Sequence, residues 1–272
     1  MTEKLSLIIN SCDKFSDIWD AHIQLLNKNW KDRQIKTYLV TDKETTKSYE
    51  GVTILSAGEG KELSDRLRYA LAVIKTEYIL FTLDDYFLTK KINTNSIFEL
   101  VSIMDKERID YLRLFARPTS HKKIEGYKSL YEIDLDSKHD SHYQINLYAG
   151  IWRRTFLEKC VQESLNAWQL EIAMTPFGRK YGANCVMSKG NEFPTLDVVR
   201  KGKFLHKAKR YIDRHGLYKG DREVISWKEE IKLNCMKTIK SISSQKMVDF
   251  YKRIMKKKGY HFYSDDVQEI QR

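Results

Sequence analysis

The amino-acid sequence predicts an α/β protein in which a mostly parallel β-sheet is flanked by helices. Two observations lead to this fold class. Short, nearly continuous apolar runs, typical of strands buried on both faces, alternate with segments whose apolar residues recur every three or four positions, as in amphipathic helices. In addition, 42% of the 272 residues are hydrophobic and only three are proline, which excludes a disordered or low-complexity chain.

The expected elements alternate along the first half of the chain. Strands are predicted at residues 5–9, 35–40, 52–55, 78–83 and 111–115. Helices are predicted at residues 17–30, 62–74, 97–104 and 154–162, and again from residue 166 onwards. Right-handed crossovers bring the carboxyl ends of parallel strands to one edge of the sheet, so the polar residues that follow the strands are expected to gather there.

The positive charge is concentrated in the C-terminal quarter. The chain has 48 Lys and Arg against 37 Asp and Glu, a formal net charge of +11, and residues 201–260 alone carry 18 basic and 6 acidic residues. Apolar residues recur at helical spacing over residues 224–255. We therefore predict an α/β domain over residues 1–210 and a basic helical extension over residues 211–272 that meets an anionic partner. A lysine-rich helical surface exposed to water is the other explanation.

The sequence indicates a cytoplasmic protein. The four cysteines, Cys12, Cys160, Cys185 and Cys235, lie far apart without metal-ligand spacing, which is typical of reduced thiols. No apolar run approaches the ~20 residues of a membrane-spanning helix. The apolar stretch at residues 5–9 is too short for a secretory signal.

The clearest candidate for a functional site is Leu83-Asp84-Asp85. Two carboxylates at the end of a buried strand repel each other and are costly to desolvate unless a cation is present. Mg²⁺ or Mn²⁺ bound by one or two carboxylates completes its coordination with diphosphate oxygens and water. The sequence therefore predicts a divalent-metal site at Asp84 and Asp85. The alternative is that the pair caps a solvated turn.

Two further segments lie near the same predicted edge. Asp13 follows the first strand, where a carboxylate can accept hydrogen bonds from a ribose or a base, although it can equally be a turn residue. The helix before the Asp84 strand opens with Asp65, Arg66 and Arg68. The guanidinium group of Arg66 or Arg68 can pair with a diphosphate, or else lie on a solvated helix face.

Trp168, Glu171 and His206 are candidates from the second half of the chain. Trp168 and Glu171 are three residues apart and share one helix face, where a ring can stack on a sugar and a carboxylate can take a hydroxyl proton. The alternative is a core tryptophan beside a surface glutamate. His206 lies among lysines and can bind a metal ion or a diphosphate, or have a structural role.

Taken together, these motifs resemble those of nucleotide-sugar glycosyltransferases of the GT-A fold, which is Rossmann-like. The resemblance rests on four segments: Ser-Cys-Asp at 11–13, Ser-Asp-Arg-Leu at 64–67, Leu-Asp-Asp-Tyr-Phe-Leu at 83–88 and Trp-x-x-Glu at 168–171. It covers residues 5–175. More narrowly, the chain looks like small bacterial enzymes that build capsular or lipopolysaccharide chains.

The resemblance implies a donor site and a metal site. Four residues correspond to donor binding: Asp13, Asp65, Arg66 and Asp84. Asp84 and Asp85 take the place of the metal-binding Asp-x-Asp of the family, and the ion is Mn²⁺ or Mg²⁺. This sequence departs from the family pattern because a leucine stands where the first aspartate is expected.

On the acceptor side, the resemblance implies that Glu171 deprotonates the attacking hydroxyl group and that Trp168 binds the acceptor. His206 loosely matches a late histidine that some relatives use as a further metal ligand. The implied activity is transfer of a sugar, with inversion, from a nucleotide-diphosphate donor such as a UDP-sugar to a hydroxyl of a glycan or lipid-linked glycan. The basic extension can hold such an enzyme on the inner face of the cell membrane.

Other classes of protein remain open from the residues alone. Trp227, Phe250 and Tyr251 lie among lysines, as in a nucleic-acid-binding surface, but no nucleic-acid motif is present and no nucleic-acid partner is expected. A phosphatase with Asp84 as the nucleophile would release phosphate without an acceptor. A nucleotidylyltransferase is disfavoured because residues 11–16 contain no glycine for a phosphate-binding loop.

Overall fold

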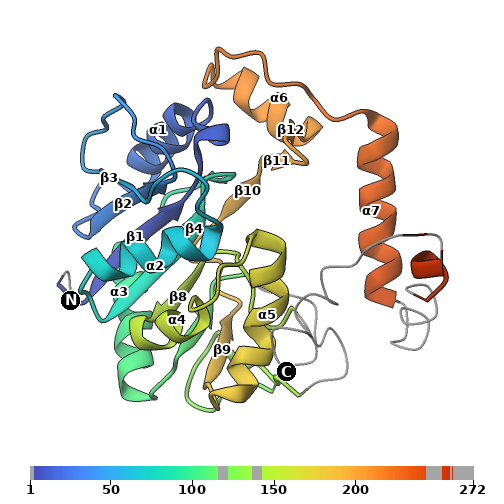
Figure 1. Cartoon of the computed structure of the whole chain (residues 1–272). Helices are drawn as coiled ribbons and strands as arrows, with labels where there is room; N and C mark the ends of the chain where they lie inside the picture. The colour runs from blue at the N-terminus through green and yellow to red at the C-terminus, as the bar shows by residue number, and fades with distance from the viewer. Residues whose placement is uncertain (1–2, 116–121, 137–142, 243–252, 258, 260–272) are drawn as a thin grey trace.

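A β-sheet lies between two layers of helices (Figure 1). The computed structural model describes residues 3–115, 122–136, 143–242, 253–257 and 259, with the backbone alone for residues 236–242. In this part of the chain one eight-stranded sheet has the order β3-β2-β1-β4-β8-β6-β9-β7. Its strands are β1 (Leu5–Asn10), β2 (Lys36–Thr41), β3 (Thr53–Ser56), β4 (Tyr78–Leu83), β6 (Tyr111–Arg113), β7 (Leu130–Glu132), β8 (Gly150–Arg153) and β9 (Cys185–Ser188).

The first half of the sheet is parallel and the second half is mixed. β1 runs parallel to both β2 and β4, and β2 runs parallel to β3. β8 lies between β4 and β6 and runs antiparallel to both, whereas β9 is parallel to β6 and antiparallel to β7. The predicted α/β class with a mostly parallel, helix-flanked sheet is confirmed, with β7 and β8 as the reversed strands.

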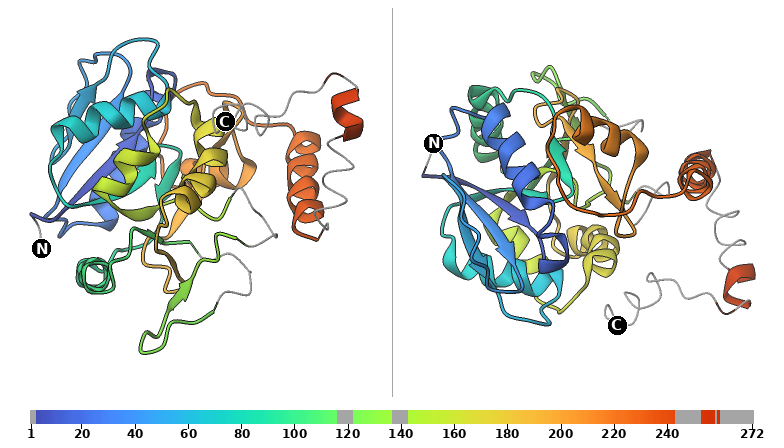
Figure 2. Two further views of the ribbon diagram at one scale, coloured as in Figure 1. Left: turned by 60° about the horizontal axis from the view of Figure 1, so that its bottom comes forward. Right: turned by 90° about the horizontal axis from the view of Figure 1, so that it is seen from above.

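Alternate side chains of the strands fill two separate cores. Ile8 of β1 packs with α2, α4 and α5 on one face, whereas Leu7 and Ile9 pack with α1 and α3 on the other. This alternation explains why the strands read as continuous apolar runs. Figure 2 shows the two helix layers from above. These helices are α1 (Trp19–Asn29), α2 (Leu63–Val73), α3 (Thr94–Lys106), α4 (Arg154–Cys160) and α5 (Ala167–Lys180).

Several short elements follow no clear periodic pattern and were not predicted. Strands of two or three residues are too short to give a periodic signal. Two small antiparallel pairs link β5 (Tyr86–Leu88) with β10 (Thr195–Asp197) and β11 (Val199–Arg200) with β12 (Lys203–Phe204). The pairing of β5 with β10 matters for function, because it brings a distant segment of the chain to the end of β4.

The C-terminal part begins on the body of the protein and then leaves it. α6 (His206–Arg214) crosses residue 210, where the first domain was predicted to end, and buries Ala208 and Ile212 against α1 and β5. α7 (Trp227–Ile242) extends away from the sheet (Figures 1 and 2). The helical prediction for residues 243–252, with Phe250 and Tyr251, lies outside the described residues.

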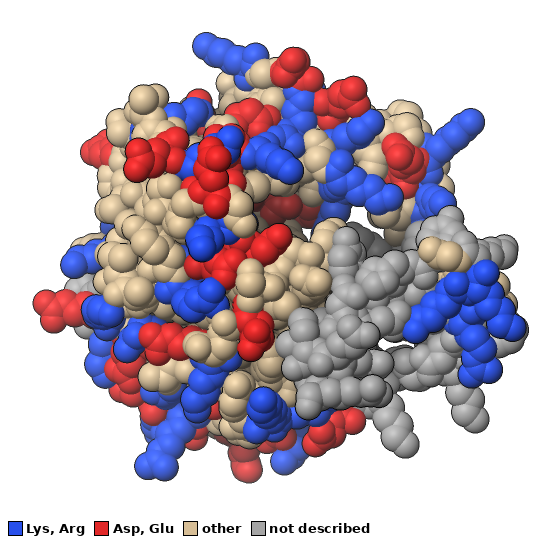
Figure 3. All heavy atoms as spheres, viewed as in Figure 1, with Lys and Arg blue, Asp and Glu red and all other residues tan. Residues whose placement is uncertain are grey.

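Basic side chains mark this part of the surface. Figure 3 shows Lys and Arg over α6 and α7, with acidic side chains among them. Within the described residues, none of the helices combines the length and the apolar character needed to cross a bilayer.

Candidate active site

The carboxyl ends of β1 and β4 meet at one edge of the sheet, as the sequence predicts. The two strands pair in parallel register up to Asn10 and Leu83. The next residues therefore lie side by side. The backbone N–H of Asp84 donates to the carbonyl of Asn10 at 3.3 Å, and the Ser11 hydroxyl donates to Asp84 Oδ2.

Helix α1 fixes Asp84 from two directions. Trp19 Nε1 donates to Ser11 Oγ at 2.5 Å, so the hydroxyl proton of Ser11 is directed at the Asp84 carboxylate. His22 Nδ1 lies 2.8 Å from the backbone carbonyl oxygen of Asp84. Because a carbonyl oxygen only accepts, Nδ1 carries the proton. The apolar spacing over residues 17–30 predicts a helix here but gives no sign of these polar contacts.

Asp85 has a different environment. Its Oδ1 is buried and has no hydrogen-bond partner. Burial raises the pKa of Asp85 well above its usual value, and the negative charges of Asp84 and Asp197 raise it further. Burial also raises the pKa of Asp84, to about 7, against the opposing effects of the Ser11 hydrogen bond and the Arg66 charge. The pair is therefore costly to ionise without a cation nearby.

A third carboxylate comes from a part of the chain that the sequence analysis did not single out. Asp197 lies opposite Tyr86 in the β5–β10 ladder, and the N–H of Val198 donates to the Asp85 carbonyl at 2.9 Å. Arg200 donates to Asp197 Oδ2 from Nε at 2.8 Å and from Nη2 at 2.6 Å. Asp197 Oδ1 is buried without a hydrogen-bond partner. No local motif signals this residue, because only strand pairing brings it here.

Arg66 lies beside the carboxylate pair, whereas its neighbours in α2 serve the fold. Arg66 Nε donates to Asn10 Oδ1 at 3.3 Å. The carboxylate of Asp65 caps the first turn of α2 and accepts a hydrogen bond from Ser164 Oγ at 2.6 Å. Arg68 donates to backbone carbonyls of residues 161 and 162. Arg66 also donates from Nη1 to the carbonyl of Lys61 at 2.5 Å, and of the three candidates in this helix it is the one whose charge acts on Asp84.

Asp13 lies at the same edge, one strand further from Asp84. It opens a short 3₁₀ turn, η1 (Asp13–Phe15), after β1. Its backbone N–H donates to Asp42 Oδ1 at 2.6 Å, and Asp42 follows β2. The Asp13 carboxylate itself is exposed and 4.0 Å from Lys43 Nζ. Its backbone is thus anchored while its side chain stays accessible to a ligand.

Trp168 and Glu171 come from the start of α5, which touches the start of α2. Ser64 Oγ donates to the carbonyl of Leu165 at 3.1 Å, just before α5 begins. Trp168 is 52% exposed, so the alternative of a core tryptophan is wrong. Glu171 is half-buried one turn further along the helix.

His206 has partners of its own at the junction of α6 and α7. Its ring stacks on Trp227 with the centroids 3.6 Å apart, and its Nδ1 pairs with Glu230. Across the described part of the chain, no group of three or more His, Cys, Asp or Glu residues is arranged to hold a metal ion. The structure therefore does not join His206 to Asp84 and Asp85 as a ligand set.

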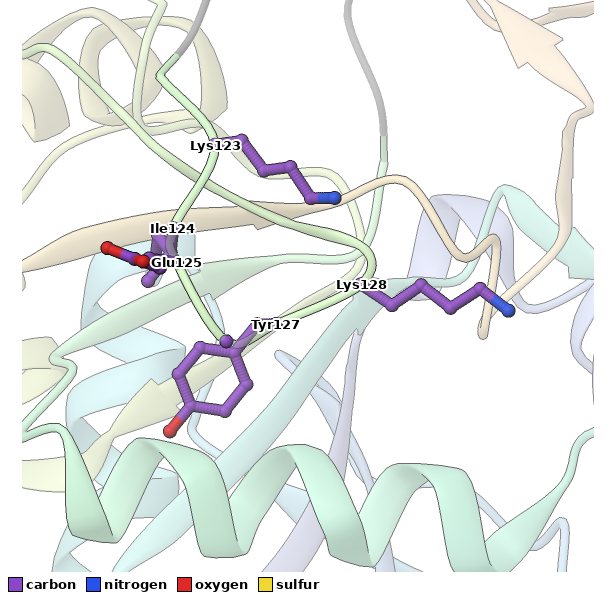
Figure 4. A pocket seen from close by; sticks show the side chains of 6 residues that line it. Lys123, Ile124, Glu125, Tyr127 and Lys128 are labelled. Carbon is purple, nitrogen blue, oxygen red and sulfur yellow. The ribbon is translucent and has the colours of Figure 1, made fainter.

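The hollow in Figure 4 is separate from these residues. It is lined by residues 123–128 of one loop before β7. A hollow formed by six consecutive residues brings no distant side chains together, and none of the predicted site residues lines it.

The fold and this edge define an α/β protein with a buried carboxylate pair at the carboxyl end of a parallel strand. No protein-family model matches the chain, and no curated protein matches it in sequence. Solved structures similar to it include S. aureus TarS, at 14% identity and a TM-score of 0.47, covering 70% of this chain and 36% of that chain.

Two other similar structures come from different enzymes. The mannosyltransferase PcManGT from Pyrobaculum calidifontis, in complex with GDP-Man and Mn²⁺, is 9% identical, with a TM-score of 0.47 over 73% of this chain and 58% of that chain. A cytidylyltransferase from Leptospira borgpetersenii is 12% identical, with a TM-score of 0.42 over 82% of this chain and 99% of that chain. At this distance the function has to come from the site itself.

Proposed function

We propose that the protein is a glycosyltransferase that moves a sugar from a nucleotide-diphosphate donor, such as a UDP-sugar, to a hydroxyl of a glycan or lipid-linked glycan. The observation that supports this most directly is the carboxylate pair after β4. Asp84 and Asp85 are buried together, burial raises both pKa values, and Asp85 Oδ1 has no hydrogen-bond partner. Such a pair is stabilised by a divalent cation that also binds a diphosphate.

The oxygen ligands that Asp84 and Asp85 offer suit Mg²⁺ or Mn²⁺. These ions prefer carboxylate oxygens, and in nucleotide sites they use one or two carboxylates and take their other ligands from phosphates and water. Asp85 would bind the ion through Oδ1, with Asp84 held beside it by Ser11. When bound, the ion would neutralise the charge that develops on the departing diphosphate.

Residues on the β1 side of the pair suit the donor. Arg66 lies next to Asn10 and its charge lowers the cost of ionising Asp84, so its guanidinium group would also favour a diphosphate bound at this carboxylate. The exposed carboxylate of Asp13 can accept hydrogen bonds from a nucleoside. Asp65 would contribute only by shaping the start of α2.

Glu171 is the proposed general base, with Trp168 beside it on α5. As the acceptor hydroxyl attacks the anomeric carbon, its oxygen forms the new bond while the bond from that carbon to the diphosphate oxygen breaks. The hydroxyl proton passes to a Glu171 carboxylate oxygen. Attack from the face opposite the leaving group would invert the anomeric centre.

The basic C-terminal region is proposed to meet an anionic membrane surface. Trp227 is 61% exposed, and Ile231, one turn later on α7, is also exposed. Lys228 and Lys232 are exposed on the same helix. Exposed apolar side chains beside lysines are typical of helices that lie at a lipid interface. The protein should sediment with phosphatidylglycerol vesicles at low salt, and Trp227→Ala should weaken this; equal sedimentation with neutral vesicles would contradict it.

A thermal-shift screen tests the central proposal. The full chain is heated with UDP, GDP, CDP, their sugars and the corresponding nucleoside triphosphates, each with and without Mn²⁺. Selective stabilisation by one nucleotide that depends on Mn²⁺ is expected, because a ligand that binds only the native state raises the melting temperature. Asp85→Asn should abolish this shift. Asp32→Asn, at an exposed site after α1, is the matched control and should keep it.

The results of this screen distinguish the proposed function from its alternatives. If no nucleotide stabilises the protein, or if stabilisation is the same without a divalent ion and in Asp85→Asn, the proposed donor site is wrong. A shift with a nucleoside triphosphate but with no diphosphate or nucleotide sugar would instead indicate a nucleotidyltransferase.

A further inference from the structure

Three aromatic rings form a continuous ladder beside the carboxylate pair. The ring centroids of Tyr86 and Tyr148 are 5.0 Å apart, and Tyr148 stacks on Phe115 at 4.9 Å with an interplanar angle of 12°. Tyr86 is buried, Tyr148 is half-buried and Phe115 is 44% exposed. We call these three residues the aromatic ladder. Its outer end is a phenyl ring that presents apolar surface to solvent.

The reversed strand β8 explains why these rings meet. Because β8 is antiparallel to β4 and β6, its first residue, Gly150, pairs with Phe81 near the carboxyl end of β4 and with Arg113 of β6. Tyr148 precedes Gly150 by two residues, and Phe115 follows Arg113 by two residues. Both therefore leave the sheet at the edge where β4 ends and where Asp84 lies.

Charged groups border the inner end of the ladder. Tyr86 directly follows Asp85 in the chain and lies opposite Asp197 in the β5–β10 ladder. Arg200 donates to Asp197 Oδ2 from Nε and from Nη2, which places its guanidinium group at the same ladder. Stacked rings edged by acceptors and a guanidinium match a saccharide, which has apolar C–H faces and a rim of hydroxyls.

We propose that the aromatic ladder is a subsite for an extended glycan acceptor, in which Phe115 stacks on a sugar beyond the one that reacts. This inference rests on the proposed glycosyltransferase function and names its acceptor class. Two ring spacings separate Phe115 from Tyr86, so a sugar on the exposed ring lies further along the acceptor than the sugar beside Asp85.

The strand order supports separate positions for the donor and the acceptor at this edge of the sheet. β1, which leads to the proposed donor contact Asp13, lies on one side of β4, whereas β8 and β6, which lead to the ladder, lie on the other. Donor and acceptor chain would therefore approach the carboxylates from opposite sides. A free monosaccharide would fill only the inner position and gain nothing from Phe115.

A glycan array of mono- to octasaccharides, probed with labelled full-length protein in UDP and Mn²⁺, tests this subsite. Binding should strengthen with chain length within at least one series. Phe115→Ala should weaken binding to the longer chains roughly 3–10-fold, the range expected for loss of one aromatic stacking contact, and leave the shortest chains unchanged. Phe115→Tyr keeps the ring and should bind as the wild type does.

The control is Tyr69→Ala, which removes an exposed ring from α2, an element that contributes no ring to the ladder. Unchanged binding by Phe115→Ala, an equal loss in Tyr69→Ala, or no retention of any arrayed chain by the wild type would each overturn the subsite. The Mn²⁺-dependent thermal shift with nucleotides is measured on the same variants. If Phe115→Ala loses that shift, the ladder binds the nucleobase instead; if the wild type shows none, the proposed function itself fails.

Discussion

The buried imidazole of His22 donates from Nδ1 to the backbone carbonyl oxygen of Asp84, 2.8 Å away. Its ring also packs edge-on against Phe87, with centroids 5.7 Å apart. Burial lowers the pKa of His22 to about 4, so the ring is neutral near pH 7. This one residue of α1 thus ties the turn after β4 to the helix layer and fixes the backbone that carries both carboxylates.

Replacing His22 should separate its hydrogen bond from its packing. His22→Phe keeps a ring but leaves the Asp84 carbonyl without its donor, which costs about 1–3 kcal/mol of unfolding free energy. His22→Asn retains a donor at nearly the position of Nδ1 while losing ring contacts. Urea unfolding measures both. If the site depends on the hydrogen bond from residue 22 to the Asp84 carbonyl, Mn²⁺-dependent nucleotide binding should be retained better in His22→Asn than in His22→Phe.

The lowered pKa of His22 should make the free energy of unfolding depend on pH. In the unfolded chain histidine titrates near pH 6.5, whereas the native His22 stays neutral down to about pH 4. Between these values only the unfolded state gains the proton, so acidification destabilises the native wild type by up to about 1.4 kcal/mol per pH unit. His22→Phe lacks this loss, and the stability gap between it and the wild type should narrow from pH 7 to pH 4.5. Parallel pH curves would contradict the prediction.

Ser11 connects Trp19 to the Asp84 carboxylate, and its removal should loosen that carboxylate. Ser11→Ala leaves Trp19 Nε1 without an acceptor and removes a donor from Asp84 Oδ2. Outer partners of metal-binding carboxylates typically contribute 10–100-fold to metal affinity, so Mn²⁺ affinity in the presence of UDP should fall by about that factor. Calorimetry measures it. Ser102→Ala, an exposed serine of α3, is the control, and wild-type affinity in Ser11→Ala would remove this role.

Local patterns were sufficient for the carboxylate pair and for the strands around it. The apolar run before Asp84 fixed β4, and the rule that parallel strands end at one edge placed Asp13 and Asp84 together. The helix that carries Trp19 and His22 also followed from the apolar spacing over residues 17–30. Their hydrogen bonds did not, because spacing predicts which face of a helix is buried and says nothing of which polar atoms meet there.

The rest of the site depends on contacts between distant segments. Asp197 reaches Asp85 only because β10 pairs with β5, and neither three-residue strand has a periodic pattern of its own. Phe115 and Tyr148 meet because β8 is reversed, whereas the alternating strand and helix pattern favours parallel neighbours. Trp168 was ambiguous for another reason: a tryptophan at helical spacing suits both a core and an exposed platform.

Glu171 can be tested apart from nucleotide binding. Glu171→Gln keeps the shape of the side chain but cannot take the acceptor proton at neutral pH. Turnover should fall about 10²–10⁴-fold, the usual contribution of a general base, while the Mn²⁺-dependent thermal shift stays unchanged. Glu163→Gln, at an exposed position before α5, provides the control. Turnover within a few-fold of the wild type would exclude Glu171 as the base.

Asp85 should show opposite effects on stability and on binding. Burial and the nearby charges of Asp84 and Asp197 raise its pKa, so its ionised form destabilises the native state as the pH rises above the unfolded-state value near 4. Asp85→Asn removes that charge without changing the side-chain size. At pH 7.5 the variant should therefore melt above the metal-free wild type, by about 2–4 °C for each kcal/mol gained, and the gap should close near pH 4. Adding Mn²⁺ with the donor nucleotide should reverse the order, because only the wild type gains stability from that ligand. A carboxylate with a purely structural role would give the contrary result at pH 7.5, since its loss would lower the melting temperature with and without Mn²⁺.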